Sequence, residues 1–167
     1  MIVKKHIYRI LVAILVVILL VVSFYMLWVH IPYYEHFNGL DEIRNQICEK
    51  NNYEYMNYFN EHRGKSVYYV LKVKIDDVPT YVAYDEKLKL VDSYQGEVID
   101  QKIIKNAVLK KYKKVLKESD LGDIEIGYEN ERFVYCMKVQ DNEKLMYIYY
   151  DISDGSFVKT YNIGKGM

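Results

Sequence analysis

Cysteine, proline and tryptophan are scarce in this sequence of 167 residues, which holds two, two and one of them. Two isolated cysteines, Cys48 and Cys136, build neither a disulfide scaffold nor a zinc site. Cys136 lies in an apolar strand pattern, where cysteine behaves as a small hydrophobic side chain. The sequence therefore favours two unpaired thiols, with a single disulfide between them as the alternative.

Excess charge of either sign is also missing, because 23 basic and 23 acidic side chains cancel. This balance argues against a strongly basic protein that binds nucleic acid. The chain contains 19 tyrosines, and a sequence so rich in aromatic residues is not expected to be disordered. The composition indicates one apolar segment joined to an ordinary folded region.

Motifs for catalysis are absent as well. The chain contains no G-x-S-x-G, H-E-x-x-H, P-loop or G-x-G-x-x-G pattern. Its four histidines are His6, His30, His36 and His62. A Ser-His-Asp or Cys-His arrangement would need His36 or His62 to reach a distant nucleophile. We therefore expect no catalytic, cofactor or metal site, and a protein that is not an enzyme.

The one long apolar run lies near the N-terminus. Residues 10–29 carry no charged side chain, and a helix of that length spans roughly 30 Å, the thickness of a bilayer's hydrocarbon core. No small-x-small cleavage site follows the run, which argues against a cleaved signal peptide. Pro32 is expected to stop or bend the helix.

Basic residues precede this run without any acidic residue between them, namely Lys4, Lys5 and Arg9. The positive-inside rule then predicts a cytoplasmic N-terminus at 1–9 and a transmembrane helix at 10–31. The remainder is expected to lie outside the cell, which makes the chain a single-pass protein of the cell membrane.

The region beyond the apolar run repeats itself. Tyr69-Val-Leu-Lys-Val73 matches Tyr135-Cys-Met-Lys-Val139, and Tyr81-Val-Ala-Tyr-Asp85 matches Tyr147-Ile-Tyr-Tyr-Asp151, both at an offset of 66 residues. A third pair, at 91–94 and 158–161, lies at an offset of 67, and one extra residue near 153–156 accounts for the change. The matches predict a duplicated unit, and the even offset keeps strand faces in phase between the copies.

Each copy alternates apolar and other residues as strands do, and Leu71 and Met137 lie on matching faces. A helix is predicted between the copies, with Asp100 as its N-cap. Its expected apolar stripe contains Ile103, Ile104, Ala107, Val108, Tyr112 and Val115. The order helix, strands, helix, strands predicts an α+β fold with antiparallel sheets, in which Leu71 and Met137 are buried against the helices.

Lysines cover much of the rest of the middle helix, between 102 and 117. They are typical of a solvated helix face, and attraction of anionic wall polymers or lipid head groups is the alternative. Tyrosines on strand faces are candidate contacts for a protein partner, because the ring supplies large contact area with a polar end. We single out Tyr68, Tyr81 and Tyr147 as possible partner-binding residues.

The order of these features resembles the TseB-like regulators of cell-wall elongation in Gram-positive bacteria. The stretch Gly64-Lys65-Ser66-Val67-Tyr68-Tyr69-Val70 is similar to the family's G-K-x-x-Y-Y-V, and Tyr147–Asp151 with Asp154-Gly155-Ser-Phe-Val158 is similar to its Y-x-D-x-x-T-G-x-x-V ending. Tyr135-Cys136 departs from the Trp-Glu that the family often has there. The resemblance covers most of the chain.

This resemblance implies an anchor followed by two PepSY-like units, at 32–95 with a juxtamembrane helix and at 96–167. It also implies a non-enzymatic regulator that binds a class B penicillin-binding protein. PepSY units accompany secreted protease precursors as well, so a modulator or inhibitor of a peptidase is the alternative function. An enzyme is the third and weakest hypothesis.

Overall fold

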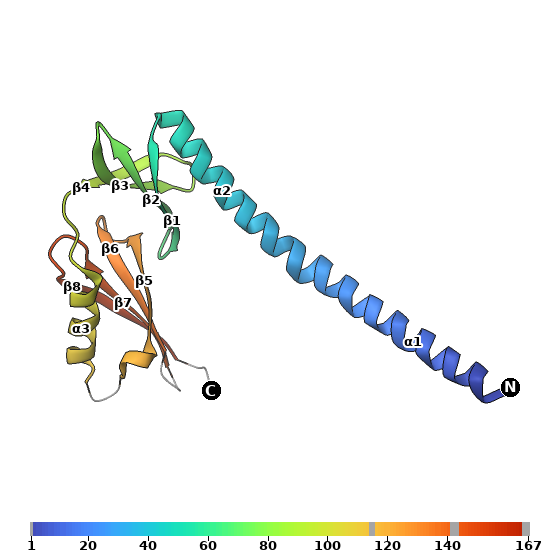
Figure 1. Cartoon of the computed structure of the whole chain (residues 1–167). Coiled ribbons are helices and arrows are strands. Elements are labelled where there is room, and N and C mark those ends of the chain that lie inside the picture. Colours follow the sequence, from blue (N-terminus) through green and yellow to red (C-terminus); the bar gives the residue numbers. More distant parts are fainter. Residues whose placement is uncertain (1, 114–115, 141–143, 165–167) are drawn as a thin grey trace. The chain divides into compact units, whose positions relative to one another are not determined.

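The computed structural model describes residues 2–113, 116–140 and 144–164 (Figure 1). The chain divides into two compact units, Met1–Asn45 and Gln46–Met167. The first unit is helical, whereas the second contains both copies of the repeat. Each unit is described by itself below.

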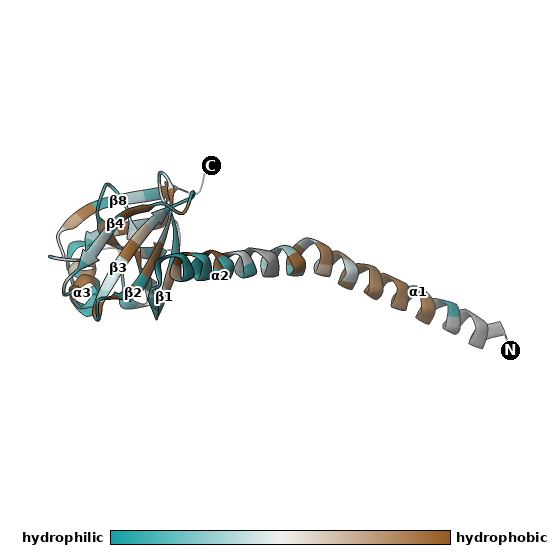
Figure 2. Cartoon of the chain, turned by 90° about the horizontal axis from the view of Figure 1, so that it is seen from above, coloured by the Kyte–Doolittle hydropathy of each residue, from teal (hydrophilic) through white to brown (hydrophobic). Residues whose placement is uncertain are grey.

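Helical structure extends from α1 (Ile2–Tyr25) through a short π-helical segment (Met26–His30) into α2 (Ile31–Asn51). The side chains from Leu11 to Val29 are exposed and almost all apolar, and the middle of α1 is accordingly mostly brown in Figure 2. By length and composition this helix is able to cross a membrane. The expected apolar helix of spanning length is therefore present.

Pro32 does not stop the helix, so this part of the sequence prediction is wrong. Proline has no backbone N–H, and the helix accommodates it with a local change in hydrogen bonding. The Ile31 N–H donates to the carbonyl of Met26, five residues earlier, within the π-helical segment just ahead of the proline. The helix then continues to Asn51.

Two four-stranded antiparallel sheets follow, with strands in sequence order. The first consists of β1 (Glu54–Arg63), β2 (Val67–Ile75), β3 (Val78–Asp85) and β4 (Leu90–Gln95). The second consists of β5 (Leu121–Tyr128), β6 (Phe133–Gln140), β7 (Lys144–Asp151) and β8 (Phe157–Gly164). We call them the first and second repeat. The α+β class and the antiparallel sheets are confirmed.

The strand registers reproduce the duplication. Tyr69 pairs with Tyr84 in the first repeat, and Tyr135 pairs with Tyr150 in the second, so both partners shift by 66 residues. The pairing of the third strand with the last has a matching irregularity in each sheet, after Ala83 in the first repeat and after Tyr149 in the second. The loop before that strand spans 86–89 in one repeat and 152–156 in the other, which supplies the predicted extra residue.

Helix α3 (Gln101–Lys111) connects the repeats and begins as predicted, because the Asp100 carboxylate accepts a hydrogen bond of 2.8 Å from the Lys102 backbone N–H. Ile104 and Val108 are buried. Ile103 is 57% exposed, so its place in the apolar stripe is corrected. Adjacent helical residues lie about 100° apart, and only one of Ile103 and Ile104 is able to face the sheet. Val115 lies outside the described residues.

Leu71 and Met137 are both fully buried, as predicted. Met137 shares one apolar cluster with Ile104 and Val108 of α3, which lies along the second sheet in Figure 1. In the first repeat, only the end of α2 belongs to the same compact unit, and Ile47 is buried there. One helix packed on each sheet is therefore not confirmed as a general arrangement. A short 3₁₀ turn (Glu118–Asp120) precedes β5.

The two repeats pack on each other through the opposite face of the first sheet. Val70, Tyr81 and Ala83 from that face join the same cluster as Tyr128, Phe133 and Tyr135 of the second repeat. Both faces of the first sheet are consequently covered in part, and β2 and β3 carry buried residues in succession rather than in alternation.

Candidate functional site

A row of lysine and tyrosine side chains crosses each sheet at the same position. In the first repeat Lys72 lies opposite Tyr81, and Tyr81 lies opposite Tyr94. In the second repeat Lys138 lies opposite Tyr147, and Tyr147 lies opposite Tyr161. Directly opposed residues share a face of the sheet. We call these sets the first and second tyrosine rows.

The first tyrosine row is covered by the second repeat. Tyr81 is only 8% exposed, with the Lys72 ammonium 5.4 Å above its ring centroid. The Tyr94 ring lies 6.3 Å from the ring of Phe133, and its hydroxyl donates a 2.8 Å hydrogen bond to the carbonyl of Glu97. This burial removes Tyr81 from the candidate partner contacts, because the position faces the other repeat and not solvent.

Tyr58 of β1 lies opposite Lys72 and extends the first row. Its ring meets Tyr81 edge-on at 6.0 Å. Its hydroxyl accepts from the Ile126 N–H at 2.5 Å and donates to the Ile126 carbonyl at 2.9 Å. Burial raises the pKa of this hydroxyl, and the backbone N–H of Ile126 only partly opposes the shift. Tyr58 therefore contacts the second repeat through the backbone of Ile126, whereas Tyr81 and Tyr94 contact it through apolar side-chain packing.

Tyr68 is half-buried and faces the junction between the repeats. Its ring meets that of Tyr128 edge-on at 5.1 Å, and it packs against the main apolar cluster. The contact is internal, so most of its ring is committed to joining the repeats.

The second tyrosine row, in contrast, is open. Tyr161 is 60% exposed, Lys138 is exposed, and Tyr147 is half-buried. Beyond it Leu145 pairs with Ile163, whose side chain is also exposed. Of the three tyrosines expected to bind a partner, only Tyr147 lies in this open row. Tyr161 was not among them, although the sequence match at offset 67 aligns it with Tyr94.

A buried polar cluster adjoins the open row on the same sheet. Glu129 is 3% exposed, and one of its carboxylate oxygens forms an ion pair of 2.7 Å with the Lys159 ammonium. Nε2 of His62, at the end of β1, lies 3.5 Å from the other Glu129 oxygen. His62 is 5% exposed, and its Nε2 has no hydrogen-bond partner among the described residues. The cluster therefore joins the hairpin of the first repeat to the second sheet.

Two glycines make room for this cluster. A Cβ on Gly127 of β5 would overlap the His62 ring, and a Cβ on Gly64 would overlap the Glu129 carboxylate. Each repeat thus supplies one glycine that accommodates a polar side chain, the His62 ring beside Gly127 and the Glu129 carboxylate beside Gly64. The sequence carries no local signal for this site, because its members lie far apart along the chain.

The electrostatics of the cluster do not favour nucleophilic chemistry. Burial lowers the pKa of His62 from 6.5, although the Glu129 carboxylate opposes the shift. Burial acts to raise the pKa of Glu129, but Lys159 and His62 outweigh it and lower that pKa. Burial raises the pKa of the nearby Cys136 thiol to about 11. A thiol with this pKa is protonated at neutral pH, whereas nucleophilic cysteines act as thiolates.

Cys136 is buried and Cys48 is half-buried, and neither is in a disulfide. The disulfide that the sequence left as an alternative is therefore not formed. Cys136 instead packs with Val134 and Tyr149 on the same face of the second sheet as Tyr147.

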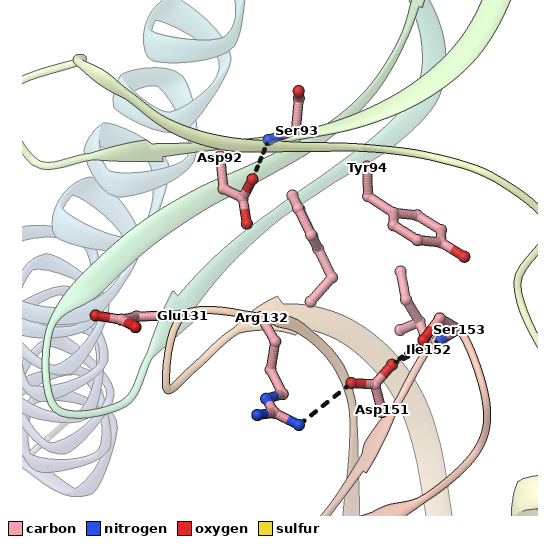
Figure 3. A pocket seen from close by; sticks show the side chains of 9 residues that line it. Asp92, Ser93, Tyr94, Glu131, Arg132, Asp151, Ile152 and Ser153 are labelled. Carbon is pink, nitrogen blue, oxygen red and sulfur yellow. Dashed lines mark hydrogen bonds and ion pairs between the residues drawn. The ribbon is translucent and has the colours of Figure 1, made fainter.

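A small pocket lies where β4 meets the turns of the second repeat (Figure 3). Its volume is about 170 Å³, below the range typical of small-molecule sites. Arg132 approaches Asp151 at 3.6 Å, and Asp92 accepts from the Tyr128 hydroxyl at 3.2 Å. In Figure 3 Glu131 points away from these groups. The polar groups are thus engaged with one another, and the pocket is a weaker candidate than the open row.

Comparisons with protein-family models, with curated proteins and with solved structures find no match to this chain.

Proposed function

We propose that this chain is a membrane-tethered, non-enzymatic regulator that binds an enzyme of cell-wall synthesis through the second tyrosine row. One observation carries the binding role. The lysine and tyrosine positions that pack against the second repeat in the first sheet are more open in the second sheet, where Lys138 and Tyr161 are exposed and Tyr147 is half-buried.

The exposed row has the composition of a protein contact. Tyrosine is enriched at the energetic centres of interfaces, because its ring buries much apolar area and its hydroxyl still finds a partner. Tyr161 and Ile163 present apolar surface beside Lys138. Covering Tyr161 and Ile163 removes that apolar surface from water at a gain of about 25 cal/mol per Å².

The apolar N-terminal helix supplies the tether in this proposal. Residues 1–9, with their basic side chains, lie in the cytoplasm in this proposal, and the repeats lie outside the cell and close to the bilayer. Membrane-bound synthases work in the same layer, so the tether raises the effective concentration of the repeats for such a partner. A class B penicillin-binding protein is the partner that the resemblance to TseB-like regulators implies, with the repeats acting as PepSY-like units.

The test is a photo-crosslinking amino acid placed at position 161 of the full-length chain in native membranes. We expect crosslinks to a penicillin-binding protein, and expect the Tyr147→Ala change to weaken them. Ile103, on α3, is about as exposed as Tyr161, and a crosslinker there is the matched control that should recover none. Recovery of a secreted peptidase at position 161 would replace the synthase with the peptidase-modulator function. Equal recovery from both positions would contradict the proposed surface.

A further inference from the structure

We infer that two copies of this chain associate by antiparallel pairing of their β8 strands, with Tyr161 at the two-fold axis, so that the two second sheets form one continuous sheet. This inference goes beyond the proposed function, because the contact uses the edge of β8 and leaves the face of the second tyrosine row uncovered. It follows from a comparison of the four strands that form the edges of the two sheets.

Three of these edge strands carry features that hinder pairing with a further strand. Strand β1 has a break in its register after Tyr55 and contains charged residues. Strand β4 has only six residues, and Asp92 lies among them. Strand β5 has a break after Leu121, and the backbone N–H and carbonyl of its Ile126 already bond to the Tyr58 hydroxyl. Each of these edges is therefore irregular, short, charged or partly covered.

Strand β8 lacks these features along most of its length. Its irregularity lies at its start, and from Lys159 to Gly164 it pairs with β7 in unbroken register. Its one charged side chain, that of Lys159, is bound to the buried Glu129 carboxylate. Among the described residues, no group outside β7 forms a hydrogen bond with the backbone of β8. The outer N–H and carbonyl groups of β8 are therefore available to another strand.

A second copy of β8 fits this edge because the strand is able to pair with itself. Side chains alternate between the two faces of a strand, so antiparallel pairing of two copies keeps matching faces together when the two-fold axis lies at a residue position. An axis at Tyr161 opposes residues 159–163 of the two copies, all within the part of β8 whose register is unbroken. The flanking pair of 158 and 164 also stays within the strand.

The side chains that this register opposes are compatible. The two Tyr161 rings, each 60% exposed, meet across the axis as a directly opposed aromatic pair. Ile163 lies opposite Lys159 of the other copy, whose ammonium is already paired with Glu129. No like charges are opposed, and the second tyrosine row continues from one copy into the other through Tyr147 and Tyr161.

Pairing of one short strand buries little surface, so we expect a weak contact that needs a high local concentration. Two copies held in one bilayer by their N-terminal helices meet this condition. The apolar helices are themselves able to associate, so the oligomeric state alone does not identify the contact. A test specific to position 161 is therefore needed.

The experiment forms a disulfide at the proposed axis. The full-length Tyr161→Cys variant, with Cys48→Ser to remove the half-buried native thiol, is reconstituted in lipid vesicles without other proteins and oxidised with copper phenanthroline. Directly opposed residues place their Cβ atoms about 4.5–5.5 Å apart, near the separation that a disulfide spans. We expect at least tenfold more covalent dimer than from Ile103→Cys, a position that is about as exposed.

A second substitution tests the register. Ile163→Lys, added to Tyr161→Cys, places another cation opposite Lys159 and should lower the dimer yield at least threefold. Ile103→Lys, added instead, should leave the yield unaltered. Circular dichroism of each variant checks that the fold is retained.

A yield at position 161 no higher than at position 103, or a yield that Ile163→Lys does not change, would overturn the inference. Because the vesicles contain no synthase, that result leaves the proposed function standing. If position 161 forms a disulfide with another protein in native membranes but none between copies in vesicles, the edge pairs with a strand of a different protein and the inference is wrong.

Discussion

The two repeats have the same strands, the same registers on their central strands and the same lysine and tyrosine positions, yet they expose them differently. Tyr81 is covered by the second repeat, whereas its counterpart Tyr147 and the neighbouring Tyr161 face outward. A duplicated sequence therefore specifies a duplicated sheet without specifying a duplicated surface. The packing of one copy on the other uses the row in the first repeat and leaves it available in the second.

The largest expected effect comes from the buried positions that the repeats share. Leu71→Asp and Met137→Asp each bury an unpaired carboxylate, and each should destabilise the fold by about 4 kcal/mol or more. Chemical denaturation followed by circular dichroism measures the change. The matched control, Ile103→Asp, alters an exposed side chain and should cost far less. A mild effect at Leu71 alone would show that the two repeats do not have equivalent cores.

The tyrosines at matching positions, Tyr94 and Tyr161, should differ in how much they contribute to stability. Tyr94→Ala removes the contact with Phe133 and the hydrogen bond to Glu97, and should cost about 2 kcal/mol of stability. Tyr161→Ala removes an exposed ring and should change stability by about 0.5 kcal/mol or less. Denaturation of the two variants under identical conditions measures both values. Equal losses would mean that the second row also serves the fold.

Substitution at the polar junction should give an effect of similar or smaller size. Gly127→Ala places a methyl group where the His62 ring lies, and overpacking of this kind costs about 1–3 kcal/mol. The control is Gly39→Ala, because a Cβ there meets nothing within 4 Å. An unchanged midpoint for Gly127→Ala would show that the ring moves freely and that the junction is loose.

The smallest expected effect is a dependence of stability on pH. In the folded chain the pKa of His62 lies below 6.5. As the pH falls, His62 is therefore protonated in the unfolded chain before it is protonated in the folded chain. Stability contributed by neutral His62 is complete above pH 6.5 and falls as the pH decreases. Glu129, whose pKa is lowered, adds a further loss below its ordinary value of 4.5. Midpoints measured from pH 7.5 to 5 should decline less in His62→Gln than in the unmodified chain.

His36→Gln changes a histidine of the N-terminal unit and serves as the control for this pH series. It should keep the slope of the unmodified chain. If the midpoint of His62→Gln depends on pH as steeply as that of the unmodified chain, the titrating group is not His62.

The sequence predicted most of the sheet structure because its determinants are local. Alternating apolar residues and turn residues set the strands, and the offset of 66 reappears in the pairing of Tyr69 and Tyr135 with their neighbours. Asp100 is a further local success, since an N-cap needs only its own side chain and the next turn. Cys48 and Cys136 form no disulfide, in agreement with the favoured prediction.

The sequence predictions failed where contacts between distant parts of the chain, or a local change in backbone hydrogen bonding, decide the structure. Pro32 sits within the helix because the preceding π-helical segment changes its hydrogen bonding. Tyr81 is buried because the second repeat packs on it, and the alternation of residues along β3 does not predict this packing. The cluster of His62, Glu129 and Lys159 joins β1, the turn after β5, and β8, which lie far apart in the sequence. Tyr161 was missed because exposure, not residue type, distinguishes it from Tyr94.

The most direct test of the account is chemical footprinting of tyrosines in the full-length chain, with mass spectrometry to resolve each residue. Iodination is compared between purified protein and native membranes that contain the partner. We expect Tyr81, which is 8% exposed, to be protected in both samples, and Tyr161 to react in the purified protein and to be protected in membranes. Equal reactivity of Tyr161 in both samples, or ready modification of Tyr81 in the purified protein, would contradict the proposed surface.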